Sequence, residues 1–359
     1  MNNAIANEIK IHVIGIGGCG GNAITNMVGA CKHEQIRFSS INTDIAALHQ
    51  CSNHEVVLIG ESITRGFGAG ADPHVARHAA QQSEEALRTL IEGSTLVILI
   101  AGLGGGTGSG ATSVLLDIAN ELDIDSICFM TLPFKAEGVK RSDIATDALN
   151  DIKQKANATL TLSNDALITA LDETVGLISA FRHCDAQMHK IVEAILTMLT
   201  STGYINVDIN DFSHILSLEG NTALGVGIAE DNSSLSAALT HALENPLVDS
   251  QSIEGTQGVI VQLNCKEEPS LAIYEDMLAT LQTLINDTSA LIISGVTLSP
   301  EMPHFSEVLI IATGIPDQHL KSNAKENVVL MKKHITGTDT FQHSGYLDIP
   351  TFVRLQNRE

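Results

Sequence analysis

The sequence is poor in basic and in aromatic side chains. Its 359 residues include 20 Lys and Arg against 42 Asp and Glu, which gives a formal net charge of −22, and they include no Trp. A chain with this charge lacks the cations that neutralise nucleic-acid phosphates or attach a protein to anionic lipid. Aromatic residues, at 3%, leave few rings on which bases or sugars stack. We therefore expect no nucleic-acid partner and no docking of the protein body on a membrane.

Long apolar segments and paired cysteines are also missing. No run approaches the roughly 18 apolar residues that span a bilayer, and residues 1–8 lack the basic and apolar regions of a signal peptide. The six cysteines show no CxxC spacing, so we expect reduced thiols in a cytoplasmic protein and no zinc site. His74 and His78 lie four residues apart without an HExxH pattern, and we expect them on an exposed helix face.

The length and the 44% of hydrophobic residues suit two domains. In the first half, short apolar runs alternate with helical patterns. Strands alternating with helices form parallel sheets covered on both faces, and ligands bind at the carboxyl ends of such strands. We therefore predict an α/β, Rossmann-like domain. The strand-like runs are residues 9–15, 37–41, 56–59, 95–101 and 126–131, and the helical patterns are 22–31, 73–91, 111–122 and 139–156.

The second half begins with a stretch that contains neither Gly nor Pro, residues 177–202, whose apolar residues repeat at helical spacing. We expect a buried helix that connects the two domains. Strand-like runs at 258–265, 290–298 and 307–314 and a helical pattern at 271–284 then predict a smaller α+β domain. From about residue 316 the chain turns polar, and a flexible linker of about 30 residues there would span roughly 30 Å.

A first glycine-rich loop, GIGGCGGN at residues 15–22, follows the first strand-like run. It fits GxGxxG, in which glycines let the backbone approach a phosphate and the following helix offers free N–H groups. Asp44 follows the second strand-like run, where a dinucleotide-binding fold places its ribose-binding carboxylate. Taken alone, this loop fits an NAD-dependent dehydrogenase, or a turn that binds nothing.

A second loop, residues 101–111, contains GGGTGSG between a buried strand and a helix. These seven residues offer consecutive backbone N–H groups and two hydroxyls to a polyphosphate. A dehydrogenase does not need this second cradle. A P-loop NTPase needs Gly-Lys-Ser/Thr, and the chain contains no Gly-Lys pair. We therefore expect backbone amides, a helix dipole and a metal ion to hold the phosphates.

With GGGTGSG the sequence resembles the tubulin/FtsZ superfamily and, within it, the bacterial cell-division GTPases of the FtsZ type. The resemblance covers essentially the whole chain. Further matching segments are Asn42-Thr43-Asp44, GFGAGADP at 66–73, Pro133-Phe134, Glu137-Gly138 followed by Arg141, and Asn164-Asp165 with Phe181. It implies a Rossmann-like parallel-sheet GTPase domain, a long central helix and a smaller α+β domain, the tubulin/FtsZ fold. The implied bounds are 1–172 for the GTP-binding domain, 173–202 for the central helix, 203–315 for the activation domain, 316–345 for the linker and 346–359 for a partner-binding peptide.

The resemblance also implies GTP or GDP with Mg²⁺ as cofactors and a set of binding residues. The 66–73 loop would face the γ-phosphate, the 133–141 segment the ribose and phosphates, and Asn164 and Phe181 the nucleoside. The implied GTP-binding set is Gly17, Gly18, Cys19, Gly20, Gly21, Asn22, Asp44, Ala69, Gly70, Ala71, Gly104, Gly105, Gly106, Thr107, Gly108, Ser109, Glu137, Arg141, Asn164, Phe181 and Asp185.

Residues 203–211, GYINVDIND, follow the long helical stretch. By itself this segment fits a loop with Asp211 as a helix N-cap. Beside GGGTGSG it matches the family's NxDxxD segment, and the resemblance implies a split active site in which this loop meets the γ-phosphate held by the next subunit. Asp208 and Asp211 would orient and polarise the attacking water, and Asn206 would help place it. Hydrolysis would then depend on head-to-tail polymerisation, since phosphoryl transfer needs positioning and charge neutralisation.

The terminal segment LDIPTFVR, residues 347–354, resembles the FtsZ C-terminal peptide. The resemblance implies membrane tethers of the FtsA or ZipA type as partners and a place at the mid-cell division site, without direct membrane insertion. Ile349, Phe352 and Val353 would form its apolar anchor. The implied contact set is Asp348, Ile349, Pro350, Phe352, Val353 and Arg354. Without the resemblance, the same residues fit a frayed terminus.

Four positions depart from the family's pattern. Cys19 replaces a usual Gly, and Ala136 replaces an aromatic residue near the nucleotide. An ungapped alignment puts Asp185 where the family has Asn, and Ala186 where it has the Asp that binds guanine. Asp185 would take over that role by a small shift, since a carboxylate there accepts both guanine donors. Otherwise guanine selectivity would weaken.

The leading hypothesis is therefore a polymerising cell-division GTPase that forms the septal ring. The alternative is a nucleotide-binding paralogue with weak GTPase activity that regulates or co-assembles with filaments. The altered guanine pocket favours this alternative, and the intact Asn206, Asp208 and Asp211 argue against it. An NAD-dependent dehydrogenase is the third hypothesis, supported by the first loop alone.

Overall fold

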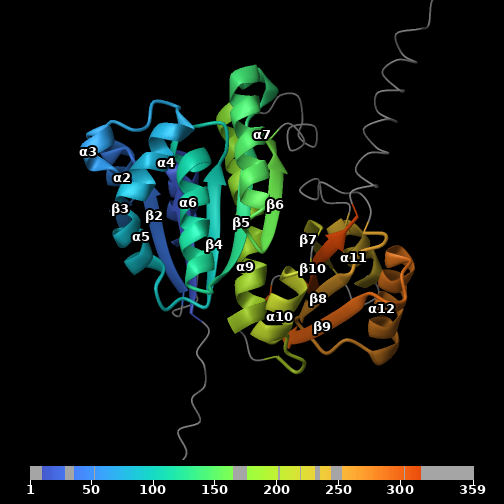
Figure 1. Cartoon of the computed structure of the whole chain (residues 1–359). Helices are drawn as coiled ribbons and strands as arrows, with labels where there is room; N and C mark the ends of the chain where they lie inside the picture. Colours follow the sequence, from blue (N-terminus) through green and yellow to red (C-terminus); the bar gives the residue numbers. More distant parts are fainter. Residues whose placement is uncertain are drawn as a thin grey trace, which may run out of the picture. The chain divides into compact units, whose positions relative to one another are not determined.

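The computed structural model describes residues 10–28, 36–51, 53–164, 176–200, 203–218, 220–230, 235–243, 253–302 and 304–316 (Figure 1). The proposed terminal peptide and nearly all of the proposed linker lie outside these residues. None of the described helices is both long and apolar enough to cross a membrane.

The first sheet has six parallel strands in the order β3-β2-β1-β4-β5-β6. Its strands are β1 (Ile11–Ile16), β2 (Ile36–Asn42), β3 (Glu55–Leu58), β4 (Leu96–Gly102), β5 (Asp125–Leu132) and β6 (Ala158–Ser163). The strand order reverses between β1 and β4. In such sheets a crevice opens outside the carboxyl ends of these two strands, because their following segments leave toward opposite faces.

Helices cover both faces of this sheet, as the apolar strands require. On one face the core contains α1 (Gly17–Val28) and α9 (Leu177–Thr200). On the other it contains α5 (Glu84–Ile91), α6 (Thr107–Glu121) and α7 (Val139–Lys153), and α4 (Pro73–Gln82) packs along α6. Two short helices, α2 (Ile45–Gln50) and α3 (Glu61–Thr64), follow β2 and β3.

The single helix expected over 73–91 is two helices, which is a correction. α4 ends and α5 begins at Ser83, whose backbone leaves the helical region. Its hydroxyl accepts a hydrogen bond from the Gly60 N–H at 2.9 Å. Because a serine hydroxyl competes with the helix for backbone partners, the tertiary contact stabilises the break.

The second sheet has four strands in the order β7-β10-β8-β9, and β8 and β9 are its parallel pair. They are β7 (Asn221–Ala229), β8 (Gly258–Cys265), β9 (Leu291–Leu298) and β10 (Ser306–Ile315). α11 (Leu235–Leu243) and α12 (Leu271–Ile285) share a core with one face of this sheet. The other face contributes to the core that contains α9 and α10 (Ile209–Leu216). The predicted fold class, a parallel α/β sheet with a smaller α+β domain, is confirmed.

Candidate functional site

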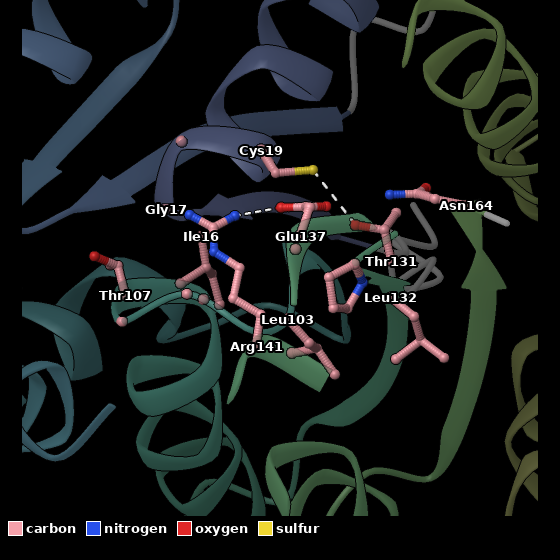
Figure 2. Close-up of a pocket in the computed structure, with 16 residues that line it drawn as sticks. Ile16, Gly17, Cys19, Leu103, Thr107, Thr131, Leu132, Glu137, Arg141 and Asn164 are labelled. Carbon is pink, nitrogen blue, oxygen red and sulfur yellow. Dashed lines mark hydrogen bonds and ion pairs between the residues drawn. The ribbon is translucent and has the colours of Figure 1, made fainter. Parts of the chain in front are cut away.

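A pocket of about 320 Å³ lies where the strand order of the first sheet reverses (Figure 2). Its volume is in the range of small-molecule sites. The lining comes from the segments that follow β1, β4 and β5, from the start of α7 and from the end of β6. The lining residues are Ile16, Gly17, Gly18, Cys19, Gly102, Leu103, Gly105, Gly106, Thr107, Gly108, Thr131, Leu132, Pro133, Glu137, Arg141 and Asn164.

Two helices begin at this pocket, α1 at Gly17 and α6 at Thr107. Their first residues are glycine-rich, and no side chain caps the first turn of α6. The N–H groups of a first helical turn have no partner within the helix, and the helix dipole adds a partial positive charge there. The pocket is therefore suited to an anion such as a polyphosphate.

The loop between β4 and α6 touches its neighbours through bare backbone. A Cβ atom on Gly106 would lie 2.8 Å from the Ala69 Cβ and 3.1 Å from the Asp72 N. Gly104 has a φ of +89°, and a Cβ there would lie 2.8 Å from the Arg141 carbonyl oxygen. Because no side chains fit at these positions, the loop packs directly against the 66–72 and 133–141 segments on either side.

The two hydroxyls of this loop differ in what they do. Ser109 is buried, and its Oγ accepts a hydrogen bond from the Gly104 N–H at 3.0 Å, so it holds the loop from behind. Thr107 lines the pocket, and its Oγ1 lies 2.8 Å from the Thr43 Oγ1. Thr107 is therefore the hydroxyl that a bound phosphate or its counter-ion would meet.

Glu137 and Arg141, four residues apart at the start of α7, form an ion pair at the pocket (Figure 2). They are the two charged residues of the lining. Glu137 also accepts a hydrogen bond from the Phe134 N–H at 2.9 Å, which fixes the short 3₁₀ turn Lys135–Glu137 before α7. The lining carboxylate is thus already engaged, whereas the Arg141 guanidinium keeps further N–H donors for an anion.

Asn164 presents an unsatisfied acceptor at the end of β6. The residue is 6% exposed, and among the described residues its Oδ1 has no hydrogen-bond partner. A buried polar atom without a partner costs about 1–3 kcal/mol. A ligand with a hydroxyl or an N–H donor would satisfy it.

Cys19 and Asp185 are the departures from the family pattern that bear on the pocket. The Cys19 Sγ lies 3.5 Å from the Thr131 Oγ1, and burial raises the pKa of this thiol, with further contributions from Asp185 and Glu137. The Asp185 carboxylate therefore lies within electrostatic reach of the pocket. Burial raises the pKa of Asp185, whereas Ala186 is exposed. The fold thus places Asp185, and not its neighbour, on the less exposed side of α9.

Other residues of the expected GTP-binding set lie outside the pocket lining. Gly104 and Ser109 are hydrogen-bonded to each other away from the pocket, and Ala69 packs against Gly106. The Asp44 carboxylate accepts hydrogen bonds from the Ala46 and Ala47 N–H groups and thereby caps α2. Gly20 and Gly21 are buried in α1, Asn22, Gly70 and Ala71 are exposed, and the side chain of Phe181 is outside the described part.

Asn206, Asp208 and Asp211 are all exposed, and none of them lines the pocket. The Asp208 Oδ1 accepts a hydrogen bond from the Asp211 N–H at 2.8 Å and caps α10. The alternative in which Asp211 caps the helix is therefore wrong, since Asp211 lies in the first turn. The Asn206 Oδ1 accepts from the Gly203 N–H at 2.6 Å, and Ile205 pairs with Val296 of β9. The segment is thus fixed at both ends while its carboxylates face outward.

Pro133 belongs to the segment expected at the ribose and phosphates, whereas Ile16, Gly102, Leu103, Thr131 and Leu132 line the pocket without having been named as binding residues. The signal that could have found them is their place at the carboxyl ends of β1, β4 and β5. Within the described residues, no three His, Cys, Asp or Glu side chains gather closely enough to hold a metal ion. The terminal set, Asp348 to Arg354, lies outside the described part of the chain.

Comparison with known proteins gives concordant results. The profile described as Tubulin/FtsZ family, GTPase domain, matches residues 10–172, and that of the FtsZ family C-terminal domain matches residues 220–316. Cell division protein FtsZ of Wigglesworthia glossinidia brevipalpis is 31% identical, with 98% of each chain covered. That of Coxiella burnetii is 32% identical over 97% of this chain and 89% of its own.

Among solved structures, an empty FtsZ dimer from M. jannaschii matches with a TM-score of 0.79 and 30% identity. The match covers 87% of this chain and 90% of that one. The two profile matches and the structural match thus extend over both the parallel sheet and the second sheet. The chain belongs to the FtsZ family of cell-division GTPases, within the Tubulin/FtsZ family.

Proposed function

We propose that this chain is a self-polymerising GTPase of the septal ring and that it hydrolyses GTP between successive subunits. One observation carries the proposal. The carboxylate in the pocket lining, Glu137, is engaged by Arg141 and by the Phe134 N–H, whereas Asp208 and Asp211 are exposed outside the pocket. A second copy that brings its 203–211 loop to this pocket would supply the groups that orient and polarise the attacking water.

The pocket residues would perform the binding half of the reaction. The N–H groups of α1 and α6 would hold the phosphates and stabilise the negative charge that spreads over the γ-phosphate in the transition state. Mg²⁺ would be held mainly by the phosphates and water, since such sites commonly use few protein ligands, and Thr107 offers the nearby hydroxyl. The ion would supply charge neutralisation. Asn164 and Asp185 would bind the nucleoside, Asn164 through its unpartnered acceptor and Asp185 through guanine N–H groups.

Exposed apolar side chains support a second copy as the partner. Phe67 is 86% exposed and Val139 76% exposed, and both belong to segments that adjoin the phosphate loop. Tyr204 is 84% exposed and lines an apolar groove of about 270 Å³ beside the 203–211 loop, together with Ile205, Pro269, Leu271, Tyr274, Val296 and Leu298. Large exposed apolar residues beside polar functional groups are typical of interfaces.

The remaining parts of the proposal concern the chain outside the pocket. We place the GTP-binding domain at residues 1–172, the connecting helix at 173–202 and the activation domain at 203–315. Residues 316–345 would serve as a linker and 346–359 as the peptide that binds tethers of the FtsA or ZipA type at mid-cell. The sequence of that peptide supports this role.

GTP turnover and pelleting, measured together across protein concentration, test the shared site. We expect turnover per subunit to rise steeply above a critical concentration, where protein begins to pellet with Mg²⁺ and GTP. Turnover proportional to protein from the lowest concentration, without pelleting, would exclude the shared site.

Mixing two inactive variants tests it more sharply. Asp211→Ala keeps a pocket but lacks the carboxylate, and Gly106→Val loses the pocket but keeps the carboxylate. A mixture forms interfaces with one intact pocket and one intact loop, so we expect turnover well above the sum of the separate variants. A mixture as inactive as its components would contradict the proposal.

The second candidate, a weakly hydrolysing paralogue, is favoured by Ala186, which is exposed and carries no carboxylate. Whether Asp185 binds guanine distinguishes the polymerising GTPase from the weakly hydrolysing paralogue. If it binds guanine, Asp185→Asn should shift preference from GTP toward XTP, whose C2 carbonyl accepts where guanine donates. Equal GTP binding by wild type and Asp185→Asn would mean that Asp185 does not recognise guanine and would support the weakly hydrolysing paralogue.

A further inference from the structure

The loop at residues 66–72 contains four residues with positive φ. Gly66, Gly68 and Gly70 adopt this region readily, whereas Ala71 has a Cβ and a φ of +61°. Residues with a Cβ rarely adopt this region, so surrounding contacts must hold Ala71 there. The two ends of the loop therefore determine how it closes on Gly106.

The first half of the loop is held by hydrogen bonds. The Gly68 N–H donates to the Thr43 carbonyl oxygen at 3.1 Å, and the Ile45 N–H donates to the Gly66 carbonyl oxygen at 3.0 Å. Thr43 is in turn bonded to Thr107 at the start of α6. This half is thus tied directly to the phosphate loop.

The second half is closed by a hydrogen bond from the Asp72 N–H to the Ala69 carbonyl oxygen at 3.0 Å and then leads into α4. Gly70 and Ala71 are exposed, and the chain passes directly into α4 through its N-cap, Asp72. A groove of about 660 Å³ lies behind them, lined by Gly70, Ala71, His74 and Arg77 on one side and by Lys140 and Asp151 of α7 on the other. α4 packs directly on α6, where bare Gly110 lies against Pro73 and Arg77, and this packing together with contacts across the groove sets where Gly70 and Ala71 lie.

One ion pair crosses this groove, from Arg77 of α4 to Asp151 of α7. Asp151 is itself held, because Lys155 lies 3.6 Å from its Oδ1 and also bonds Ser113 and Asp117 of α6. Burial alone would raise the pKa of Asp151, yet hydrogen bonds from Ser113 and Arg77 hold it below its usual value. The Arg77 guanidinium therefore grips a fixed carboxylate.

We propose that Arg77 is a positioning residue: through Asp151 it keeps α4, and with it the second half of the 66–72 loop, closed against the phosphate loop. A loop that faces the γ-phosphate then distinguishes a nucleoside triphosphate from a diphosphate only while this pair is intact. The inference rests on the proposed function, because it requires that the pocket binds GTP with this loop at its terminal phosphate.

The test compares the dissociation constants of GTP and GDP below the concentration at which protein pellets. In Arg77→Gln we expect GTP to bind about three- to five-fold more weakly, the size of a partly exposed ion pair, with GDP almost unchanged. Arg88→Gln is the matched control, since Arg88 pairs with Glu84 and with Glu121 of α6 but does not touch this loop. It should lower thermal stability similarly and leave the GTP-to-GDP ratio at the wild-type value.

Asp151→Asn and the double variant complete the test. If Arg77 acts through Asp151, the double variant has the same ratio as either single variant, because the second change has nothing left to remove. Equal losses for GTP and GDP in Arg77→Gln, or additive losses in the double variant, would overturn the inference. Failure of wild type to bind either nucleotide would instead refute the proposed function.

Discussion

The pocket of the first sheet and the 203–211 loop differ in the charge of the groups that they expose. The pocket offers neutral backbone N–H groups at two helix starts, and its one lining carboxylate is paired with Arg141. The loop carries Asp208 and Asp211, which are exposed at the start of α10 and outside the pocket lining. A triphosphate would be repelled by free carboxylates in its own pocket. Under the proposed function, binding and water activation would lie on separate surfaces that assembly brings together.

The largest effect should come from removing a carboxylate of the loop. We expect Asp211→Ala to lower GTP turnover about 10²- to 10³-fold, the usual size for losing one group that acts on the transition state. Nucleotide affinity should stay within two-fold of wild type, because Asp211 does not line the pocket. Steady-state turnover and nucleotide titration measure the two quantities.

Asn210→Ala is the matched control for this change, since Asn210 is exposed in the same turn of α10. It should keep wild-type turnover. A similar loss in both variants would mean that the substitutions only disturb α10. The catalytic role that we propose for the 203–211 loop would then be contradicted.

The second effect concerns the buried sheet beneath the pocket. His12 of β1 is fully buried, its Nε2 lies 2.7 Å from the Ser39 Oγ, and burial lowers its pKa to about 4. In the unfolded chain this pKa is near 6.5, so below pH 6.5 the unfolded state binds a proton that the folded state refuses. The free energy of unfolding should therefore fall by about 3 kcal/mol between pH 6.5 and pH 4.

Urea unfolding at several pH values measures this loss, and His12→Gln should flatten it because glutamine does not titrate. His74→Gln, which changes an exposed histidine of α4, should keep the wild-type slope. If the free energy of unfolding of His12→Gln fell as steeply with pH as that of wild type, groups other than His12 would be responsible for the acid sensitivity.

The third effect compares a closely packed glycine of the pocket with a glycine outside the pocket lining. Gly106→Ala places a methyl group against Ala69 and Asp72, so either the phosphate loop or the 66–72 loop must shift. We expect nucleotide affinity to fall about ten-fold, equivalent to about 1.4 kcal/mol. Gly176→Ala, at a position with open space around it, should bind as wild type does. Unchanged affinity in Gly106→Ala would show that the two loops are not pressed together.

Much of the first domain could be predicted because its strands are continuous apolar runs bounded by glycine loops. The two glycine-rich motifs follow β1 and β4, the strands between which the order reverses. The sequence pattern missed β6, whose alternate positions are only partly buried, and β7, in which Gly225 and Gly227 look like turn signals. Such strands are stabilised by neighbours that are distant in sequence, which no local pattern contains.

The candidate site divides in the same way. The glycines of the pocket lining could be predicted because a turn that brings bare backbone close to a ligand needs glycines that are adjacent in the sequence. Thr131 and Leu132 were missed because they reach the pocket only through the pairing of β5 with β4. Likewise Asp208, and not Asp211, caps α10. Both are aspartates, which suit an N-cap equally well, so the residue type alone does not show at which of them the helix begins.

The smallest effect should separate apolar from electrostatic contributions to assembly. The net charge of −22 makes copies of the chain repel one another, whereas contacts of Phe67 and of the Tyr204 groove depend little on salt. The screening length falls from about 30 Å at 0.01 M to about 10 Å at 0.1 M salt. We therefore expect the critical concentration for pelleting to fall about two- to three-fold over this range at fixed free Mg²⁺.

A steady rise in the critical concentration with salt would mean that attraction between charged groups, such as Asp208 or Asp211 meeting Arg141 of the next subunit, outweighs repulsion between the subunits. Pelleting of Asp211→Ala over the same salt series separates the two cases, because only the second predicts that its salt dependence differs from that of wild type.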